Sequence, residues 1–504
     1  MRSSSVVTTC GPVIGDCADG VVCFKGIPFA RAERFRRAVA PVPWRDPLPC
    51  FAFGPVAPQC DSGALSADED CLNLNIWAPE RCDQPLPVLF WIHGGAFVAG
   101  AGSDYNGGFL AAHGPAVIVT VNYRLGPFGF LQLDKLGSGF EDANNLAMTD
   151  VLAALDWVRD NISDFGGNPD QITLFGQSAG AAMVTTLMTL QQARGKFRRS
   201  IAFSVPGRRI ATVAQAMEVT NGFLAELDLR QDQAGRIMTL SLGQILAATE
   251  AVSAKIAARL PTGTLFGPVF DGEFIVQDPM DAVRAGAVND RELWLGSCRD
   301  EMEMFLRSTP PAAMITTTEA QIRRDFGDAG WNSLLDCYQA TANVDEDPRQ
   351  ALLSDAMWHR PLAELASNQV SAGGRVWLSR FDHRPNLAPF TTLGPTHGAD
   401  NACLWAHIPV FVERPVLGRI GGPMTLADIE VTARLQASVL GFAAQGAPDC
   451  GSGWEVFDGT TRCTAIFQSP FAVVHRPDLE RHEIWLTMAG RTSLPGSAPL
   501  TPAA

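Results

Sequence analysis

Hydrophobic residues follow two patterns along this chain. Short apolar runs, each bounded by turn-forming residues, predict strands that are buried on both faces. These runs are Val88–Ile92, Ala116–Val121, Gln171–Phe175, Ser200–Ser204, Glu292–Ser297 and Arg375–Phe381. From Thr149 the apolar spacing is instead that of one face of a helix, which is expected to end at Gly166–Gly167, before Pro169. The members of this helical stripe are Val151, Ala154, Leu155, Val158 and Ile162.

The alternation of strand-like and helical segments predicts an α/β fold with one doubly wound, mostly parallel sheet. A length of 504 residues would allow two or three domains, but no internal repeat or low-complexity linker divides the chain. We therefore expect residues 1–490 to form a single domain. Residues 491–504, which are rich in Ser, Pro and Ala, are expected to form a loose tail.

Composition narrows the choice of partners and compartment. The net charge of −14 leaves no basic surface for nucleic acid or anionic lipid, and no apolar run is long enough to span a membrane. The N-terminal segment lacks the apolar core of a secretory signal, so we expect a cytoplasmic protein. The twelve cysteines show neither C-x-x-C pairs nor zinc spacing, which favours reduced, buried thiols and no metal site. The oligomeric state stays open.

Candidate chemistry begins at the stretch FGQSAGA, residues Phe175–Ala181. Its G-x-S-x-G pattern could be an ordinary glycine turn, but here a strand precedes it and an apolar helical segment follows. A strand, tight turn and helix in this order form the nucleophile elbow that exposes a reactive serine, here Ser178. A serine needs a neighbouring base and fixed N–H donors for the oxyanion. The stretch Trp91–Phe97, WIHGGAF, follows a strand and offers small residues whose backbone N–H groups could face a ligand.

With these motifs, the chain resembles the type-B carboxylesterases, the α/β-hydrolase family that includes bacterial carboxylesterases and the cholinesterases. The resemblance implies a central, mostly parallel twisted sheet flanked by helices, with helical cap or lid insertions. It implies Ser178 as nucleophile and the backbones of Gly95, Ala96 and Ala179 as the oxyanion hole. The segments that carry it are Gly26–Ala30, Glu69–Pro79, Trp91–Phe97, Val121–Phe130 and residues 154–181.

The same resemblance implies an acid and a base further along the chain. The acid falls on Glu301, directly after the predicted strand at Glu292–Ser297, with Asp300 and Glu303 as competitors. The base falls on His397, in a Gly- and Pro-bracketed loop, with His407 as the runner-up.

Several positions depart from the family pattern. Gln177 precedes the nucleophile where Glu is common, and its side chain is expected to point beneath the site toward the histidine, unless it is a turn residue facing away. Ser204 matches a family serine that lies behind the active site. Cys60 and Cys71 match positions that form a disulfide in secreted relatives, and whether they do so here is left open.

These features predict a serine carboxylic ester hydrolase that acts through an acyl-enzyme on small to medium esters. The chemistry needs no metal and no organic cofactor, and the expected partner is a small-molecule ester substrate. One alternative is a lipase acting on aggregated lipid, although the segment Gly207–Leu260 carries scattered charge where a lid would be apolar. The other is a non-catalytic recognition protein of the same fold, in which the serine would be lost.

Overall fold

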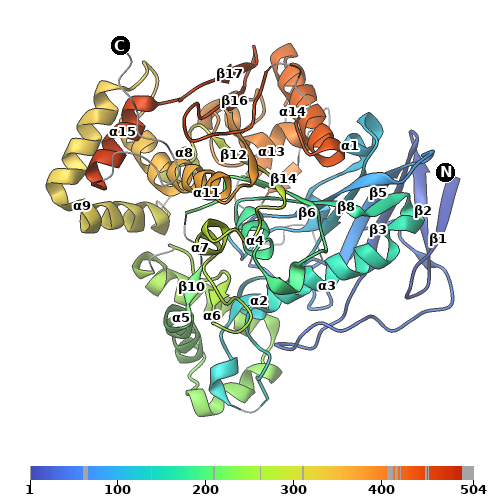
Figure 1. The fold of residues 1–504 in the computed structure, drawn as a ribbon. Helices are drawn as coiled ribbons and strands as arrows, with labels where there is room; N and C mark the ends of the chain where they lie inside the picture. The colour runs from blue at the N-terminus through green and yellow to red at the C-terminus, as the bar shows by residue number, and fades with distance from the viewer. Residues whose placement is uncertain are drawn as a thin grey trace.

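A sheet of thirteen strands runs through the whole molecule (Figure 1). The computed structural model describes residues 2–490 except 61–65, 138, 208–209, 261–262, 309–311, 406–411, 415–417, 421, 449–450 and 452. The strands are β1 Arg2–Val7, β2 Pro12–Ala18, β3 Val21–Pro28, β4 Leu48–Pro49, β5 Asn73–Pro79, β6 Leu86–Ile92, β7 Val117–Val121, β8 Gly167–Gln177, β9 Arg199–Phe203, β12 Glu292–Cys298, β13 Arg375–Phe381, β16 Thr464–Phe467 and β17 Ala472–Val474. Their order is β1-β2-β3-β5-β7-β6-β8-β9-β12-β13-β16-β17, with β4 beside β2.

The centre of the sheet is parallel and its margins are mostly antiparallel, although the two-residue strand β4 pairs with β2 in parallel. Every neighbouring pair from β7 through β6, β8, β9, β12 and β13 to β16 is parallel. The pairs β1–β2, β2–β3, β3–β5, β5–β7 and β16–β17 are antiparallel. The mostly parallel sheet expected from the sequence is therefore confirmed. The N-terminal antiparallel strands were not predicted, because their mixed burial gives no continuous apolar run.

Helices cover both faces of the sheet. They are α1 Gly108–His113, α2 Gly126–Phe130, α3 Leu146–Asn161, α4 Ala179–Leu187, α5 Val213–Glu226, α6 Leu242–Ile256, α7 Pro279–Arg284, α8 Glu303–Arg307, α9 Ala313–Ala340, α10 Pro348–Ser354, α11 Arg360–Ser371, α12 Phe390–Leu393, α13 Ala399–Leu404, α14 Leu426–Gln445 and α15 Leu479–Met488. Two small sheets pair β10 (Ala211–Thr212) with β11 (Val269–Phe270) and β14 (Val412–Arg414) with β15 (Gly418–Ile420).

Alternate side chains of the central strand β6 enter two different hydrophobic cores. Val88, Phe90 and Ile92 pack with the apolar stripe of α3, whereas Leu89 and Trp91 pack with α1 and α14. All five residues predicted for the helical stripe are fully buried. The helix itself ends at Asn161, and a 3₁₀ turn, Ile162–Phe165, continues to Gly166, which has a φ of 83°. Burial on both faces explains the continuous apolar runs of the central strands.

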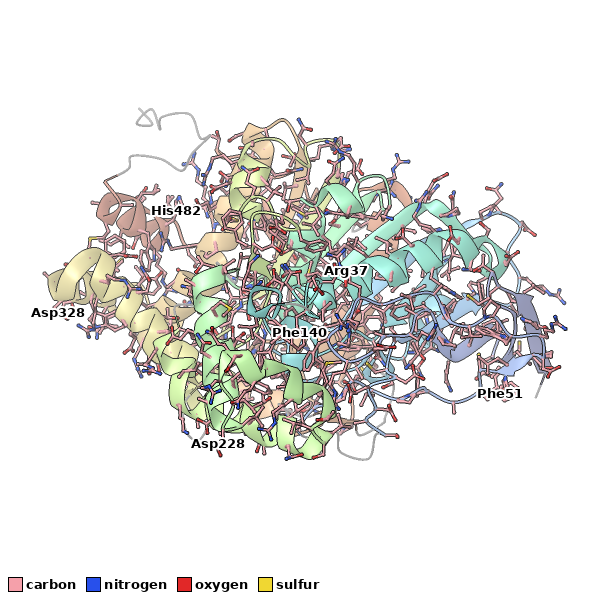
Figure 2. The ribbon with its side chains drawn as sticks, turned by 90° about the horizontal axis from the view of Figure 1, so that it is seen from below. Arg37, Phe51, Phe140, Asp228, Asp328 and His482 are labelled. Atoms are coloured by element: carbon pink, nitrogen blue, oxygen red, sulfur yellow. The ribbon has the colours of Figure 1, made fainter. Side chains whose placement is uncertain are left out.

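Two groups of helices extend beyond the sheet. Helices α5 and α6 form one group, and α9, α10 and α15 form the other, around a third core that includes Trp331, Trp358 and Trp485. Figure 2 shows Asp228, beyond α5, and Asp328, on α9, at separate margins of the molecule. No described helix combines the length and apolar character that crossing a bilayer requires. The expected tail, 491–504, lies outside the described residues, and the single-domain assignment stays a prediction.

Candidate active site

The turn that carries Ser178 is a sharp bend between β8 and α4. Strand β8 ends at Gln177 and α4 begins at Ala179, so Ser178 alone joins them, with φ 57° and ψ −123°. A side chain on Gly180 would place its Cβ 2.0 Å from the carbonyl oxygen of Ile92, and one on Gly176 would lie 2.5 Å from the backbone of Gly180. These contacts explain why glycine occupies positions 176 and 180, because only residues without Cβ allow the helix to start so close to the strands.

The loop after β6 lies directly against this turn. A Cβ on Gly94 would lie 2.8 Å from the carbonyl oxygen of Gln177 and 3.1 Å from Cβ of Ser178. Gly95 and Ala96 both have positive φ, 111° and 52°. The backbone N–H groups predicted for the oxyanion hole, those of Gly95, Ala96 and Ala179, donate no hydrogen bond to any other described residue. They remain available to a negatively charged oxygen beside Ser178.

Glu301 lies on the turn that follows β12. Its side chain is fully buried, and its Oε1 accepts a 2.8 Å hydrogen bond from the backbone N–H of Cys298. The two competing acids face other partners. Asp300 pairs with Arg299 at 2.8 Å, and Glu303 pairs with Arg307 one helical turn further on.

His397 lies between Glu301 and Ser178. Its Nδ1 is 2.5 Å from Oε2 of Glu301, and its Nε2 is 2.8 Å from Oγ of Ser178. A bridge between Asp300 and Thr396 ties the acid turn to the histidine loop. The rings of Phe305 and Trp358 lie 5.3 and 5.4 Å from the imidazole. The structure thus brings together the serine, histidine and acid chosen from the sequence, whereas His407 lies outside the described residues.

Hydrogen bonding determines how these groups share protons. A carboxylate can only accept, so Nδ1 of His397 donates to Glu301 and its Nε2 is left to accept the Ser178 hydroxyl proton. Asp400, three residues beyond the histidine, is buried on the neighbouring helix α13. Burial raises the pKa of the Asp400 carboxyl to about 7, and the nearby charge of Glu301 adds to this shift. Asp400 is therefore partly protonated near neutral pH, and Glu301 is the carboxyl group that contacts His397.

Comparison with known proteins decides the family. The chain matches the Carboxylesterase family over residues 2–485. The chain belongs to the carboxylesterase family. It is 33% identical to the para-nitrobenzyl esterase of Bacillus subtilis, over 96% of this chain and 98% of the relative. It is 31% identical to the fumonisin B1 esterase of Sphingopyxis macrogoltabida, over 90% of this chain and 84% of the relative.

The fold agrees with this membership. The structure of a carboxylesterase from Geobacillus stearothermophilus superposes with a TM-score of 0.82 at 30% identity, covering 95% of this chain and 99% of the other. This carboxylesterase therefore has the α/β-hydrolase fold expected from its sequence, and it is a carboxylic ester hydrolase. In the described part of the chain, no three His, Cys, Asp or Glu side chains are grouped to hold a metal ion.

Gln177 and Ser204 lie behind the serine of this carboxylesterase. The Gln177 amide nitrogen is 3.3 Å from Nε2 of His397, so the side chain faces the histidine. Ser204 is fully buried with a φ of 50°, and its backbone N–H donates to the carbonyl oxygen of Gly296 at 2.7 Å. The Ser204 hydroxyl has no hydrogen-bond partner among the described residues. Gln177 thus faces the histidine, and Ser204 follows Phe203, whose carbonyl oxygen accepts from the Ser178 N–H at 3.0 Å. Their role in supporting the site stays a prediction.

Cys60 and Cys71 are separate thiols in this carboxylesterase. Cys60 is exposed and Cys71 is fully buried. Partial burial of its sulfur and the neighbouring Glu250 raise the pKa of the Cys60 thiol to about 11, and full burial raises the pKa of Cys71 even further, so both are protonated thiols near neutral pH.

Some residues that support the site were not selected from the sequence. The Tyr123 hydroxyl donates to the carbonyl oxygen of His93 at 2.8 Å, and the two rings stack at 4.4 Å, which holds the start of the glycine loop. Ser354 and His359 contact the acid turn from behind. Tyr123 lies in the segment Val121–Phe130 that carries the family resemblance, but Ser354 and His359 lie in no such segment, so only the fold reveals their contacts.

Proposed function

We propose that this carboxylesterase hydrolyses small to medium carboxylic esters through an acyl-enzyme formed on Ser178. The observation that carries the proposal is the continuous hydrogen-bonded line from Ser178 through His397 to Glu301, with spacings of 2.8 and 2.5 Å. Such a line activates a serine that would otherwise be a poor nucleophile at neutral pH.

In the proposed first step, Nε2 of His397 takes the Ser178 proton while Oγ attacks the ester carbonyl. Glu301 stays ionised, orients the imidazole and stabilises the imidazolium that forms. The backbone N–H groups of Gly95, Ala96 and Ala179 donate to the oxyanion of the tetrahedral intermediate. His397 then gives its proton to the departing alcohol, which leaves the acyl group on Ser178.

In the second step, water takes the place of the alcohol. His397 removes a proton from the water as it attacks the acyl carbonyl, and then returns the proton to Oγ of Ser178 as the acid leaves. The residues of the site supply every proton transfer of this cycle. Gln177 and Ser204 are proposed to support the site from beneath, without touching the substrate.

The proposed size class of the substrate is supported by the relatives. Their names describe esterases of para-nitrobenzyl esters and of fumonisin B1. We also propose a cytoplasmic location, which is supported by the unpaired state of Cys60 and Cys71.

A panel of p-nitrophenyl esters from acetate to palmitate, together with an emulsified triglyceride, tests this proposal. Short and medium chains should be turned over fastest, and the Ser178→Ala variant should stay at the background rate on every substrate. Faster turnover of emulsified long-chain lipid would instead identify a lipase. A folded Ser178→Ala variant with wild-type turnover would refute the assignment of the nucleophile.

A further inference from the structure

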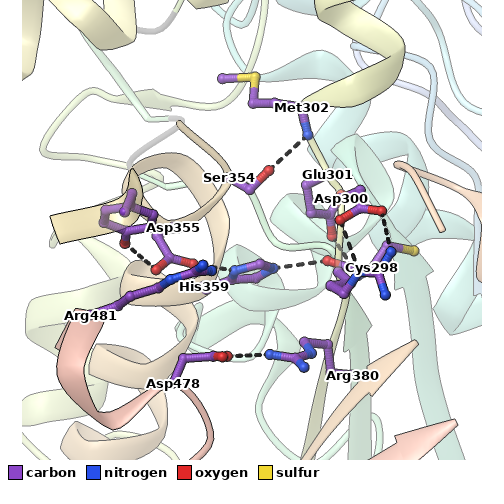
Figure 3. Close-up of polar contacts among 12 residues, drawn as sticks. Cys298, Asp300, Glu301, Met302, Ser354, Asp355, His359, Arg380, Asp478 and Arg481 are labelled. Atoms are coloured by element: carbon purple, nitrogen blue, oxygen red, sulfur yellow. Dashed lines mark hydrogen bonds and ion pairs between the residues drawn. The ribbon is translucent and has the colours of Figure 1, made fainter. Parts of the chain in front are cut away.

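A short π-helix lies behind the turn that carries Glu301 (Figure 3). It covers Asp355–His359 and joins α10 to α11. Two side chains from this region hold the two ends of the acid turn. Ser354 Oγ accepts a 3.0 Å hydrogen bond from the backbone N–H of Met302, and His359 Nε2 lies 2.8 Å from the carbonyl oxygen of Cys298. Glu301 lies between these two anchored residues.

The backbone of Cys298 links His359 to Glu301. Its carbonyl oxygen faces His359, while its N–H donates to Oε1 of Glu301 at 2.8 Å. Cys298 is fully buried at the end of β12. A movement of this residue would therefore alter the hydrogen bond that fixes the carboxylate opposite His397.

The contacts of His359 require both of its ring nitrogens to carry a proton. Nε2 faces a carbonyl oxygen, which can only accept, and Nδ1 faces Oδ1 of Asp355 at 2.6 Å. Asp355 also accepts from the Tyr338 hydroxyl, which in turn accepts from the indole N–H of Trp485 at 2.8 Å. Burial lowers the pKa of His359, but the hydrogen bond and charge of Asp355 outweigh it and raise the pKa to about 9.

Other charged groups surround this pair. Arg380, on the neighbouring strand β13, opposes the imidazolium charge but is paired with Asp382 and Asp478. Arg481 on α15 favours the ionised form of Asp355. A cavity of about 120 Å³ beside His359 is also lined by the charged or titratable groups Arg360, Glu364, Arg380, Arg462, Asp478 and His482. Asp355, whose Oδ1 lies 2.6 Å from Nδ1 of His359, keeps the imidazolium in place.

We propose that His359 is a positioning residue for Glu301. As an imidazolium it ties the Cys298 carbonyl to the π-helix, so that the Cys298 N–H stays aimed at the Glu301 carboxylate and the carboxylate at His397. The inference rests on the proposed roles of Ser178, His397 and Glu301. His359 itself touches neither substrate nor nucleophile.

The test compares His359→Leu, which removes both donors, with His359→Gln, whose amide N–H can still donate to Cys298. The Leu variant should lose about 10- to 100-fold in kcat with little change in KM, the scale typical of residues that orient a catalytic group. Its acid limb of kcat/KM should move to lower pH, because a displaced Glu301 supports the imidazolium of His397 less well. The Gln variant should restore most of kcat at neutral pH.

His383→Leu is a matched control. It removes another partly buried histidine that bonds an aspartate, with Nε2 of His383 2.7 Å from Oδ1 of Asp428 on α14. This variant should leave kcat and the acid limb unchanged. A folded His359→Leu variant that also keeps the wild-type kcat and pH profile would overturn the proposal.

If the Leu variant does not fold, the pH dependence of kcat at alkaline pH tests the proposed role of His359 instead. The His359 proton is present below its pKa of about 9 and is lost as the pH rises through that value. Wild-type kcat should therefore fall above about pH 9, and this fall should vanish in the folded His359→Gln variant. An identical alkaline fall in both proteins would overturn the proposal. Failure of the wild-type enzyme to hydrolyse any ester would instead refute the proposed function.

Discussion

The two halves of the candidate site are held together by different forces. On the nucleophile side, Ser178 and the glycine loop are fixed by backbone packing, since a Cβ on Gly94 or Gly180 would collide with neighbouring main chain. On the acid side, Glu301 is fixed by a hydrogen bond from the N–H of Cys298, which is in turn held by the charged pair of His359 and Asp355. Steric contacts therefore fix the nucleophile side of the site, and polar contacts fix the acid side.

Because of this difference, substitutions on the two sides should have different effects on the kinetics. Steric packing does not depend on protonation, so damage to the nucleophile side should lower kcat equally at every pH. Hydrogen bonds to ionised groups do depend on protonation, so damage to the acid side should lower kcat and also shift the pH profile. Substitutions on the two sides can therefore be distinguished by kinetics alone.

Apart from loss of the nucleophile itself, the largest effect is expected on the polar side, from Glu301→Gln. The amide no longer stabilises the imidazolium or fixes the His397 tautomer, so kcat should fall by about 10³- to 10⁴-fold. Asp300→Asn and Glu303→Gln serve as controls, because both acids pair with arginines instead of the histidine. If Glu303→Gln proved the damaging change in steady-state kinetics, the assignment of the acid would be wrong.

On the steric side, Gly180→Ala should cost about 10²-fold in kcat, because the new Cβ would lie 2.0 Å from the Ile92 carbonyl oxygen and push the elbow out of place. The acid limb of its pH profile should not move. Gly243→Ala is the matched control, since Gly243 also lies in the first turn of a helix, α6, but has no atom within 4 Å of its Cβ position. Equal activities of the two variants would contradict the steric account.

Gln177 lies where the two halves meet. Its amide nitrogen is 3.3 Å from His397, so Gln177→Glu would place a negative charge beside the imidazole and favour the imidazolium. More alkaline conditions would then be needed to free the base, and the acid limb of kcat/KM should move up by about one pH unit. The exposed Gln191→Glu adds the same charge at a distance and should have no effect. A profile for folded Gln177→Glu that overlays wild type would show that the side chain is electrically uncoupled from the histidine.

The smallest effect is expected from reducing agent. Cys60 and Cys71 are unpaired thiols, so neither half of the site depends on a disulfide between them. Loss of a native disulfide typically costs about 2–5 kcal/mol, which would appear as a clear drop in melting temperature. Thermal unfolding with and without dithiothreitol should therefore coincide, and a drop of several degrees on reduction would point to a bond between these cysteines.

The same division into a steric and a polar half explains which parts of the site could be predicted from the sequence. The steric half leaves local signals, because strand, glycines and serine lie within a few residues of one another. The predicted strand at Val88–Ile92 covers most of β6, whereas the one at Gln171–Phe175 covers only the middle of the longer β8, Gly167–Gln177. Glu301 and His397 were placed by resemblance to the family, since nothing local marks an acid 96 residues from its histidine.

The support for Glu301 could not be predicted. Ser354 and His359 lie more than fifty residues from the backbone groups they bind, and such contacts depend on the tertiary packing of the π-helix. The antiparallel strands β1 to β3 were not predicted for another reason. Only part of each strand is buried, so hydrophobic periodicity was too weak to reveal them.

The most direct test of the account is to identify the residue that carries the acyl group. An alkyl p-nitrophenyl phosphonate forms a stable phosphonyl ester with an activated serine, and mass spectrometry of the digested protein locates it. We expect a single adduct on the peptide containing Ser178, formed in step with loss of esterase activity and absent from the folded Ser178→Ala variant. Complete inactivation without phosphonate on Ser178, or with the adduct on another residue, would contradict the account.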